Sequence, residues 1–365
     1  SREKLAWVLD STSSPVAILI PFIGWGVYIM GLIQAEFENL GVAESDYTTF
    51  VRAIPFQFYA ILAIIMIPLV AFTKLDFSQM KKAEMRAEKE NRAADLVQEE
   101  IVHEIKNGYS LKHAKPIMVI LPIVVVFATL FGTLAPLGFP FAKVDGNAFR
   151  VALTMGYFFG AAVLMALICL FKVMDFNETF KVYVGGMKGM TDVAITLILA
   201  WSLGKMISGL GTAEFIVKFL QDMSFSASLV PAAVFLFGAF ISFSTGSSWG
   251  TFAIMMPLAI PMAHAFGIPF YIAVGAVLSG GLFGDHCSPI SDTTILSSTG
   301  AGCGLVEHIK TQLPYAAVNG TIAFIAYIIT GLTGSEAALG FAVIALIVVM
   351  AVLNRISAAR LAGKE

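Results

Sequence analysis

The stretch from Gly284 to Gly300 constrains the fold of this chain more than any other, because its polar side chains are flanked by long apolar runs. It contains two carboxylates, a histidine, eight hydroxyl or thiol groups, a proline and a glycine at each end. Main chain inside a bilayer must satisfy its own hydrogen bonds, so irregular segments survive there only against protein or a water-filled cavity. Ionisable side chains at that depth mark an ion or proton site by default. We therefore predict an unwound, cation-binding segment at membrane depth.

Composition places the chain in a lipid bilayer. Hydrophobic residues make up 58% of the 365 residues and charged residues only 13%, with a mean hydropathy of +0.82. Soluble domains are usually near half apolar and a quarter charged, so we predict an all-α, multi-pass protein of the cell membrane. A net charge of −2 gives no reason to expect a nucleic-acid partner. The apolar runs that suit whole or broken spanning helices are 15–33, 54–73, 116–138, 150–172, 192–211, 227–243, 252–265, 268–283, 313–333 and 336–354.

Basic residues in short loops predict the orientation of the chain. Segment 74–115 carries nine Lys or Arg residues and is assigned to the cytoplasm. The mixed charges of its middle predict a solvated helix stabilised by ion pairs. The acid-rich segment 34–53 is then extracellular, and the basic segment 172–188 returns to the cytoplasm.

The start of the chain resembles the stretch at 284–300, which indicates an internal repeat. Aligning Pro15 with Pro289 places Gly26 opposite Gly300, and an aspartate precedes each proline. Broken helices at matching places are typical of inverted-repeat transporters, whose cargo binds where the breaks meet. The front of the first repeat is missing relative to the second, so we expect an N-terminally incomplete version of a longer protein. The predicted parts are the remainder of the first repeat (1–73), a charged cytoplasmic loop (74–115), connecting transmembrane helices (116–184) and the second repeat (185–365).

A second polar cluster spans residues 242–251, between two shorter apolar runs. Small residues permit a tight turn, so we predict a re-entrant hairpin of two half-helices with its tip here. Hydroxyl and carbonyl oxygens are the ligands that hard cations prefer. The alternative is an ordinary helix-packing surface rich in small residues. The predicted ion or substrate ligands in this cluster are Ser244, Thr245, Ser247, Ser248 and Thr251.

Asp285 is predicted to carry the exchangeable charge, with Asp292 as a second Na⁺ ligand seven residues later. A carboxylate at membrane depth holds either a proton or a sodium ion, and that competition is the minimal antiport mechanism. The alternative is a carboxylate that merely caps a half-helix. The hydroxyls predicted to complete the site are those of Ser288, Ser291, Thr293 and Thr294.

Further polar residues are assigned to the same pathway. His286 is a candidate proton relay or a hydrogen-bonded structural histidine, and Asp192 is a candidate relay or a charge at a helix start. The first-repeat counterparts predicted to face the site are Asp10, Ser13 and Ser14. No second His or Cys pair accompanies His286, so no resident metal or other cofactor is expected, and Na⁺ and H⁺ are cargo.

Several motifs resemble those of the NhaC-type Na⁺/H⁺ antiporter family. Residues 283–302 (FGDHCSPISDTTILSSTGAG) and 311–315 (TQLPY) resemble its signature. Residues 245–251 (TGSSWGT) with Pro257 resemble its hairpin motif, and 10–15 (DSTSSP) the first-repeat counterpart. The resemblance implies an ion-transporter-type fold with paired re-entrant hairpins and coupling to Na⁺ or H⁺. It also implies a choice of cargo, since members exchange sodium for protons, exchange organic acids such as malate and lactate, or carry amino acids. The chain departs from the pattern in lacking the first hairpin.

The predicted function is secondary active transport, namely antiport of a monovalent cation (Na⁺) and protons by alternating access. The alternative is a Na⁺- or H⁺-coupled carrier of a small organic acid or an amino acid. Arginine often clamps carboxylate cargo, and the arginines here lie in loops or at helix ends, which favours a bare cation. A remote alternative, an intramembrane aspartyl protease, would pair Asp285 with Asp192, but the hydroxyl-rich flank does not suit it and no enzyme is expected. The assembly state is left open, with a homodimer among the options.

Overall fold

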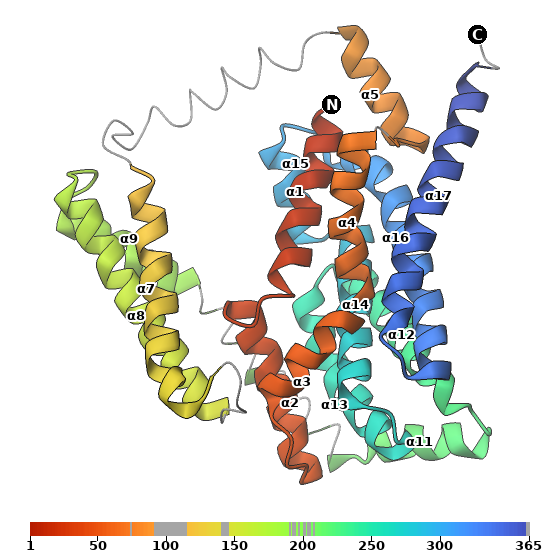
Figure 1. The fold of residues 1–365 in the computed structure, drawn as a ribbon, viewed down its shortest axis with the longest axis horizontal. Coiled ribbons are helices and arrows are strands. Elements are labelled where there is room, and N and C mark those ends of the chain that lie inside the picture. The colour runs from red at the N-terminus through yellow and green to blue at the C-terminus, as the bar shows by residue number, and fades with distance from the viewer. Residues whose placement is uncertain are drawn as a thin grey trace. The chain divides into compact units, whose positions relative to one another are not determined.

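A computed structural model of the chain describes residues 1–73, 75–90, 115–139, 146–189 and 209–362, with single positions between 191 and 206. Every regular element in these ranges is helical (Figure 1), which confirms the predicted all-α class. The chain divides into two compact units, one formed by Ser1–Ala94 with Leu199–Glu365 and the other by Asp95–Ile198. The domain boundaries proposed from the sequence remain predictions.

Most of the described helices belong to the first unit; 3₁₀ helices are marked η. They are α1 (Arg2–Ala17), α2 (Gly24–Leu40), α3 (Asp46–Ala53), η1 (Ile54–Phe56), α4 (Phe58–Thr73), α5 (Ser78–Glu90), α11 (Thr212–Asp222), η4 (Ala227–Leu229), α12 (Val230–Thr245), α13 (Ser248–Phe266), α14 (Phe270–Cys287), α15 (Asp292–Gly300), α16 (Leu305–Thr333) and α17 (Ala337–Ala362). The second unit contains α7 (Ile117–Leu134), η3 (Ala135–Leu137), α8 (Gly146–Leu170) and α9 (Phe176–Gly189).

Within the described residues, seven helices are long and apolar enough to cross a membrane, and a further bent pair, Asp46–Phe56 with Phe58–Thr73, passes the same test. The chain is therefore an integral membrane protein. Helices α12 and α13 each belong to a candidate span of 19 residues, so both are longer than the half-helices expected from the sequence. Whether they form a re-entrant hairpin stays a prediction. The seven spans are Ile117–Leu137, Ala148–Leu170, Ala227–Thr245, Ser248–Phe266, Phe270–Cys287, Leu305–Thr333 and Ala337–Ser357.

The stretch at 284–300 is a helix broken at residues 288–291, between α14 and α15. Ser288 adopts an extended conformation (φ −80°, ψ 129°), which is favoured before a proline. Pro289 has no N–H with which to continue the helix. The helix restarts where the Ser291 hydroxyl accepts a hydrogen bond from the Thr294 N–H at 3.4 Å, as an N-cap residue does.

A second broken helix lies near the start of the chain, but its break is not where the alignment with the second repeat placed it. Pro15 lies inside α1, and the helix ends only before residues 18–23. A Cβ on Gly26 would come within 2.6 Å of the Pro21 main chain, so this turn requires glycine. The apolar run 15–33 is therefore two helix ends and a break rather than one spanning helix. Aligning Pro15 with the proline of the second repeat does not superpose the two breaks.

The two broken helices run in opposite directions through the first unit. In Figure 1, α1 leads down into α2, whereas α14 leads up to α15, which packs beside α1. Helix α2 in turn packs on α13, the helix that precedes α14. An antiparallel pair of broken helices is the arrangement that an inverted repeat produces.

Helix α14 packs on α12 through glycines. A Cβ on Gly280 would come within 2.3 Å of the carbonyl oxygen of Phe235, and one on Gly284 within 2.3 Å of that of Ala239. Small residues let helix backbones approach closely in a membrane, where packing rather than hydrophobic burial favours association. This contact fixes the last turns of α14, where Asp285 lies.

Substitution of Gly280 by alanine should destabilise the protein, because the added methyl group meets main chain that cannot move aside. Overpacking costs about 1–3 kcal/mol, so we expect Gly280→Ala to lower the Tm and the monodisperse yield of the purified full-length protein. Gly31→Ala is the control, since no atom lies within 4 Å of a Cβ at Gly31. Equal Tm values for the two variants would contradict this account of the α12–α14 contact.

Candidate functional site

Asp285 lies in the last turn of α14, beside the break, and its residue surface is only 1% exposed. Its Oδ2 accepts a hydrogen bond from the Thr293 hydroxyl at 3.3 Å, and that hydroxyl lies 3.0 Å from the Ser291 hydroxyl. Its Oδ1 is buried and has no hydrogen-bond partner among the described residues. The Thr293 hydroxyl thus binds one carboxylate oxygen, and the other has no hydrogen bond in the described part of the chain.

Asp10 lies on α1 and is fully buried. Its Oδ2 accepts hydrogen bonds from Gln312 Nε2 at 2.6 Å and from the Thr294 hydroxyl at 3.3 Å. The same oxygen is 3.7 Å from His308 Nε2, and Oδ1 is 3.9 Å from His286 Nε2. Three helices of the second half of the chain, α14, α15 and α16, therefore contact one carboxylate on α1.

The first turn of α15 joins the two carboxylates. Consecutive residues donate to different helices, Thr293 to Asp285 on α14 and Thr294 to Asp10 on α1. A shift of α15 would therefore alter both carboxylates at once. We call these four residues, with Tyr59, His286, His308 and Gln312, the carboxylate cluster.

His286 links Asp10 to Tyr59 on α4. The Tyr59 hydroxyl lies 3.1 Å from His286 Nδ1, and both side chains are buried. When the phenol donates, Nδ1 is the acceptor and the proton on Nε2 faces Asp10. This arrangement is chemically able to relay a proton, and the relay role of His286 stays a prediction.

The polar cluster at 242–251 forms the end of α12, a tight turn and the start of α13. A Cβ on Gly246, whose φ is 65°, would lie 2.8 Å from the Ile290 main chain, so the turn contacts the break at 288–291. The Ser242 hydroxyl donates to the Gly281 carbonyl of α14 at 2.5 Å, whereas the predicted ligands of this cluster lie within their own helices. Ser244, Thr245 and Thr251 donate to main-chain carbonyls one turn earlier, Ser247 caps α13, and Ser248 is buried in its first turn. No hydrogen bond joins them to either carboxylate in the described part of the chain, and their role as ion ligands stays a prediction.

The structure does not bring the Asp292 carboxylate into the buried cluster, and its role as a second Na⁺ ligand stays a prediction. Its side chain is exposed at the start of α15, where Oδ1 accepts the Thr293 N–H at 3.0 Å. That contact is the helix-start role considered as the alternative from the sequence. Asp192 falls outside the described residues.

The predicted serine ligands divide between buried and exposed positions. Ser14 and Ser288 are buried, the first on α1 and the second in the break after α14. Ser291 is buried beside Thr293. Ser13 is exposed and donates to the main-chain carbonyl of Asp10, so the structure does not bring its hydroxyl to the cluster.

Sequence reasoning missed three members of the cluster. His308 and Gln312 are four residues apart on α16, so they lie on one face of that helix, and both are buried against Asp10. This i, i+4 spacing of polar residues at the edge of an apolar run was a signal that could have found them. Tyr59 lies in a uniformly apolar helix and gave no such signal.

Unpartnered polar atoms gather in the cluster. Such atoms cost about 1–3 kcal/mol each when buried, so they indicate a bound partner or a functional role. The oxygens among them match the ligand preference of hard monovalent cations, and the carboxylates can alternatively take protons. Within the described ranges, no group of three or more His, Cys, Asp or Glu residues is arranged to hold a metal ion. The atoms are Asp10 Oδ1, Asp285 Oδ1, Gln312 Oε1, His286 Nε2 and both ring nitrogens of His308.

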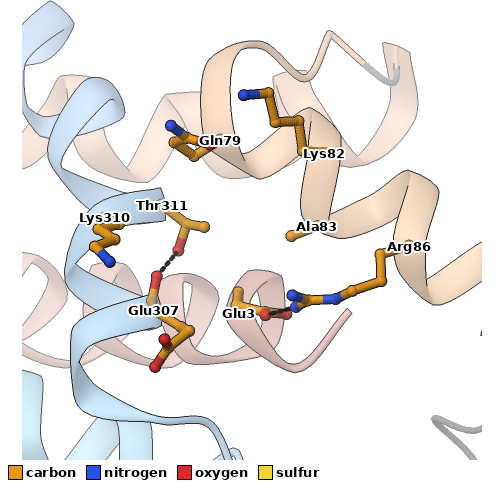
Figure 2. Close-up of a pocket in the computed structure, with 8 residues that line it drawn as sticks. All are labelled: Glu3, Gln79, Lys82, Ala83, Arg86, Glu307, Lys310 and Thr311. Atoms are coloured by element: carbon orange, nitrogen blue, oxygen red, sulfur yellow. Dashed lines mark hydrogen bonds and ion pairs between the residues drawn. The ribbon is translucent and has the colours of Figure 1, made fainter.

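A separate cavity of about 490 Å³ lies where α1, α5 and α16 meet (Figure 2). Figure 2 shows Arg86 reaching from α5 to an ion pair with Glu3, and Thr311 donating to the main-chain carbonyl of Glu307. Glu3 precedes Asp10 by seven residues on α1, or roughly 10 Å along the helix. No member of the carboxylate cluster lines the cavity. Its lining residues are Glu3, Gln79, Lys82, Ala83, Arg86, Glu307, Lys310 and Thr311.

Comparison with known proteins agrees with the resemblance noted in the motifs. An uncharacterized protein of Haemophilus influenzae is 35% identical over 97% of this chain and 69% of its own length. An arginine/ornithine antiporter of Halobacterium salinarum is 30% identical over 40% of this chain and 29% of its own length. A malate-2H⁺/Na⁺-lactate antiporter of Bacillus subtilis is 31% identical over 34% of this chain and 26% of its own length.

The aligned regions thus cover less than a third of each of the two named antiporters. No solved structure matches the chain. A family model described as the Na⁺/H⁺ antiporter family matches residues 16–332, which is most of the sequence and includes the break at 288–291. The chain belongs to the Na⁺/H⁺ antiporter family.

Proposed function

We propose that the protein exchanges a monovalent cation, Na⁺, for protons by alternating access, and that the two ions compete for Asp285. The observation that carries this proposal is the Oδ1 of Asp285, which is buried at a helix break without a hydrogen-bond partner among the described residues. A proton neutralises the carboxylate, whereas a cation binds its ionised form, so the binding of one excludes the other. Membership of an antiporter family supports this assignment.

Asp10 provides a fixed negative charge next to the exchange site. It accepts two hydrogen bonds, one of them from an amide N–H that can only donate, and it faces two histidines. Asp285 accepts one hydrogen bond from Thr293, and a hydroxyl can turn its lone pairs toward a cation instead. The difference in partners favours Asp285 as the carboxylate that exchanges ions.

The transport of an organic cargo is the second candidate, because the relatives named above carry amino acids or organic acids. No Lys or Arg side chain is buried in the described part of the chain, so an anionic cargo would lack the guanidinium clamp that such ligands favour. This absence argues against an anionic cargo such as malate or lactate, and the assay below separates an inorganic cation from arginine. The aspartyl protease alternative depended on Asp192, which is outside the described residues, and membership of the antiporter family argues against it.

Neutralising Asp285 should abolish cation-driven proton movement. Proteoliposomes that contain the full-length protein and a pH-sensitive dye would receive Na⁺, Li⁺ or K⁺, and separately arginine, lactate or malate. We expect dye recovery with Na⁺ for the wild type and none for Asp285→Asn, because asparagine offers neither a charge nor a site for an exchangeable proton. Asp222→Asn, at an exposed position on α11, should behave as the wild type.

Two results would contradict the proposal. The first is Na⁺-driven recovery that survives in Asp285→Asn. The second is a wild-type protein that responds to arginine, lactate or malate but not to any inorganic cation, which would favour the organic cargo. Asp292→Asn should retain most of the flux, since the Asp292 side chain is exposed. Loss of the flux in this variant would support Asp292 as a second Na⁺ ligand.

Removing the Thr293 hydroxyl should weaken the apparent affinity for Na⁺. That hydroxyl stabilises the ionised Asp285 that a cation binds, and hydrogen bonds to charged groups are worth about 1.5–3 kcal/mol. A loss of about 1.4 kcal/mol of binding free energy raises a dissociation constant tenfold. We therefore expect Thr293→Val to raise the half-saturating Na⁺ concentration by about 10-fold. Thr293→Ser keeps the hydroxyl and should stay close to the wild type. Equal shifts in both variants would contradict the role of this hydrogen bond, because only the serine variant keeps the hydroxyl.

A further inference from the structure

Gln312 on α16 joins the two halves of the carboxylate cluster. Its side chain is buried, with 1% of the residue surface exposed. Its Nε2 donates to Asp10 Oδ2 at 2.6 Å and to the main-chain carbonyl of His286 at 2.9 Å. One amide nitrogen therefore connects α1, α14 and α16.

The carbonyl that Gln312 binds is at a sensitive place in the main chain. Helix α14 ends one residue after His286, and the last carbonyls of a helix have no partner within it. The Asp285 carbonyl accepts the Ser288 N–H at 3.1 Å, and the His286 carbonyl accepts Gln312. Gln312 thus binds the peptide group between His286 and Cys287, one peptide beyond the one that follows Asp285.

The hydrogen bonds of Gln312 also fix which way its amide points. A flipped amide would place Oε1 against Asp10 Oδ2 and the His286 carbonyl, three acceptors with no donor among them. The observed orientation leaves Oε1 buried and without a hydrogen-bond partner in the described ranges. Asp10 Oδ1 and Asp285 Oδ1 are left free in the same way. The cluster therefore presents one neutral and two anionic oxygens that nothing in these ranges satisfies.

We propose that Gln312 is a specificity-determining residue of the transport site, whose Oε1 is a neutral oxygen ligand for the bare monovalent cation. This inference rests on the proposed cation/proton exchange at Asp285. A neutral ligand adds to the coordination shell without adding charge, so it affects the choice among Na⁺, Li⁺ and K⁺ without adding a second group for which protons and the cation compete. The number and position of oxygen ligands decide such choices, and two hydrogen bonds determine the position of this one.

Replacement of Gln312 by leucine, which is similar in size and has no polar atom, tests the inference. In the dye assay with full-length protein, we expect Gln312→Leu to raise the half-saturating Na⁺ concentration by about 10-fold. This change corresponds to about 1.4 kcal/mol of binding free energy, which we assign to the loss of one oxygen ligand. We also expect the ratio of the Li⁺ and Na⁺ values to change. Gln312→Asn, which keeps a shorter amide, should lie between the leucine variant and the wild type. If Gln312→Leu does not insert into the membrane, Gln312→Met is tested in its place, because the methionine side chain is flexible enough to fill irregular gaps.

Asn319 provides the matched control. It is a buried amide on the same helix, seven residues further along, and its Nδ2 contacts Met66 Sδ at 3.7 Å rather than a carboxylate. Asn319→Leu should lower the Tm without changing the half-saturating concentrations or their ratio. If the Gln312 variants change only the Tm, as Asn319→Leu does, the inference is overturned and the exchange at Asp285 stands. If the wild type shows no cation response, the proposed function and this inference both fall.

Discussion

Two carboxylates on different helices, Asp10 and Asp285, are buried within reach of consecutive hydroxyls on α15, and much of the first unit is arranged around this contact. Burying a charged group without partners is very costly, so each carboxylate needs donors close by. The break at 288–291 provides them, because it turns the chain so that the first turn of α15 faces both α1 and α14. Without the break, a continuous helix would carry Thr293 and Thr294 away from both carboxylates, since residues eight positions apart lie about 12 Å apart along a helix.

The packing around the cluster accounts for the functional assignment. Glycines on α14 let α12 approach so closely that the end of the helix bearing Asp285 has little freedom. The proposed exchange site is thus held at the end of a closely packed helix, directly beside the unwound residues 288–291. Broken helices that meet at a buried site are the common architecture of alternating access. The two carboxylates differ in their partners, and on this difference rests the proposal that Asp10 is a fixed charge and Asp285 an exchangeable one.

Local patterns in the sequence predicted the all-α class, an apolar run at each of the seven candidate spans among the described residues and a helix broken around Pro289, although two of these runs were expected to form half-helices. They could not tell which helix faces meet. Asp292, like Asp285, is a carboxylate in a polar stretch between apolar runs, so the sequence suggests the same role for both. In the structure a helix restarts at Asp292, and its side chain is exposed. Pro15 looked like a break but lies within α1, because a membrane helix tolerates proline when neighbours satisfy the freed carbonyl. The i, i+4 spacing of His308 and Gln312 marks a polar helix face, but it does not show that this face meets Asp10, which lies 302 positions from Gln312 in the sequence.

Equilibrium binding of ²²Na⁺ to the purified full-length protein tests the central claim most directly, because it needs no transport cycle. Saturable binding should appear in the wild type at neutral and alkaline pH and weaken as the pH falls, since protons and Na⁺ compete for Asp285. Asp285→Asn should bind no Na⁺ while keeping the elution profile and helical content of the wild type. Binding that persists in Asp285→Asn, or that does not change with pH in the wild type, would contradict the account.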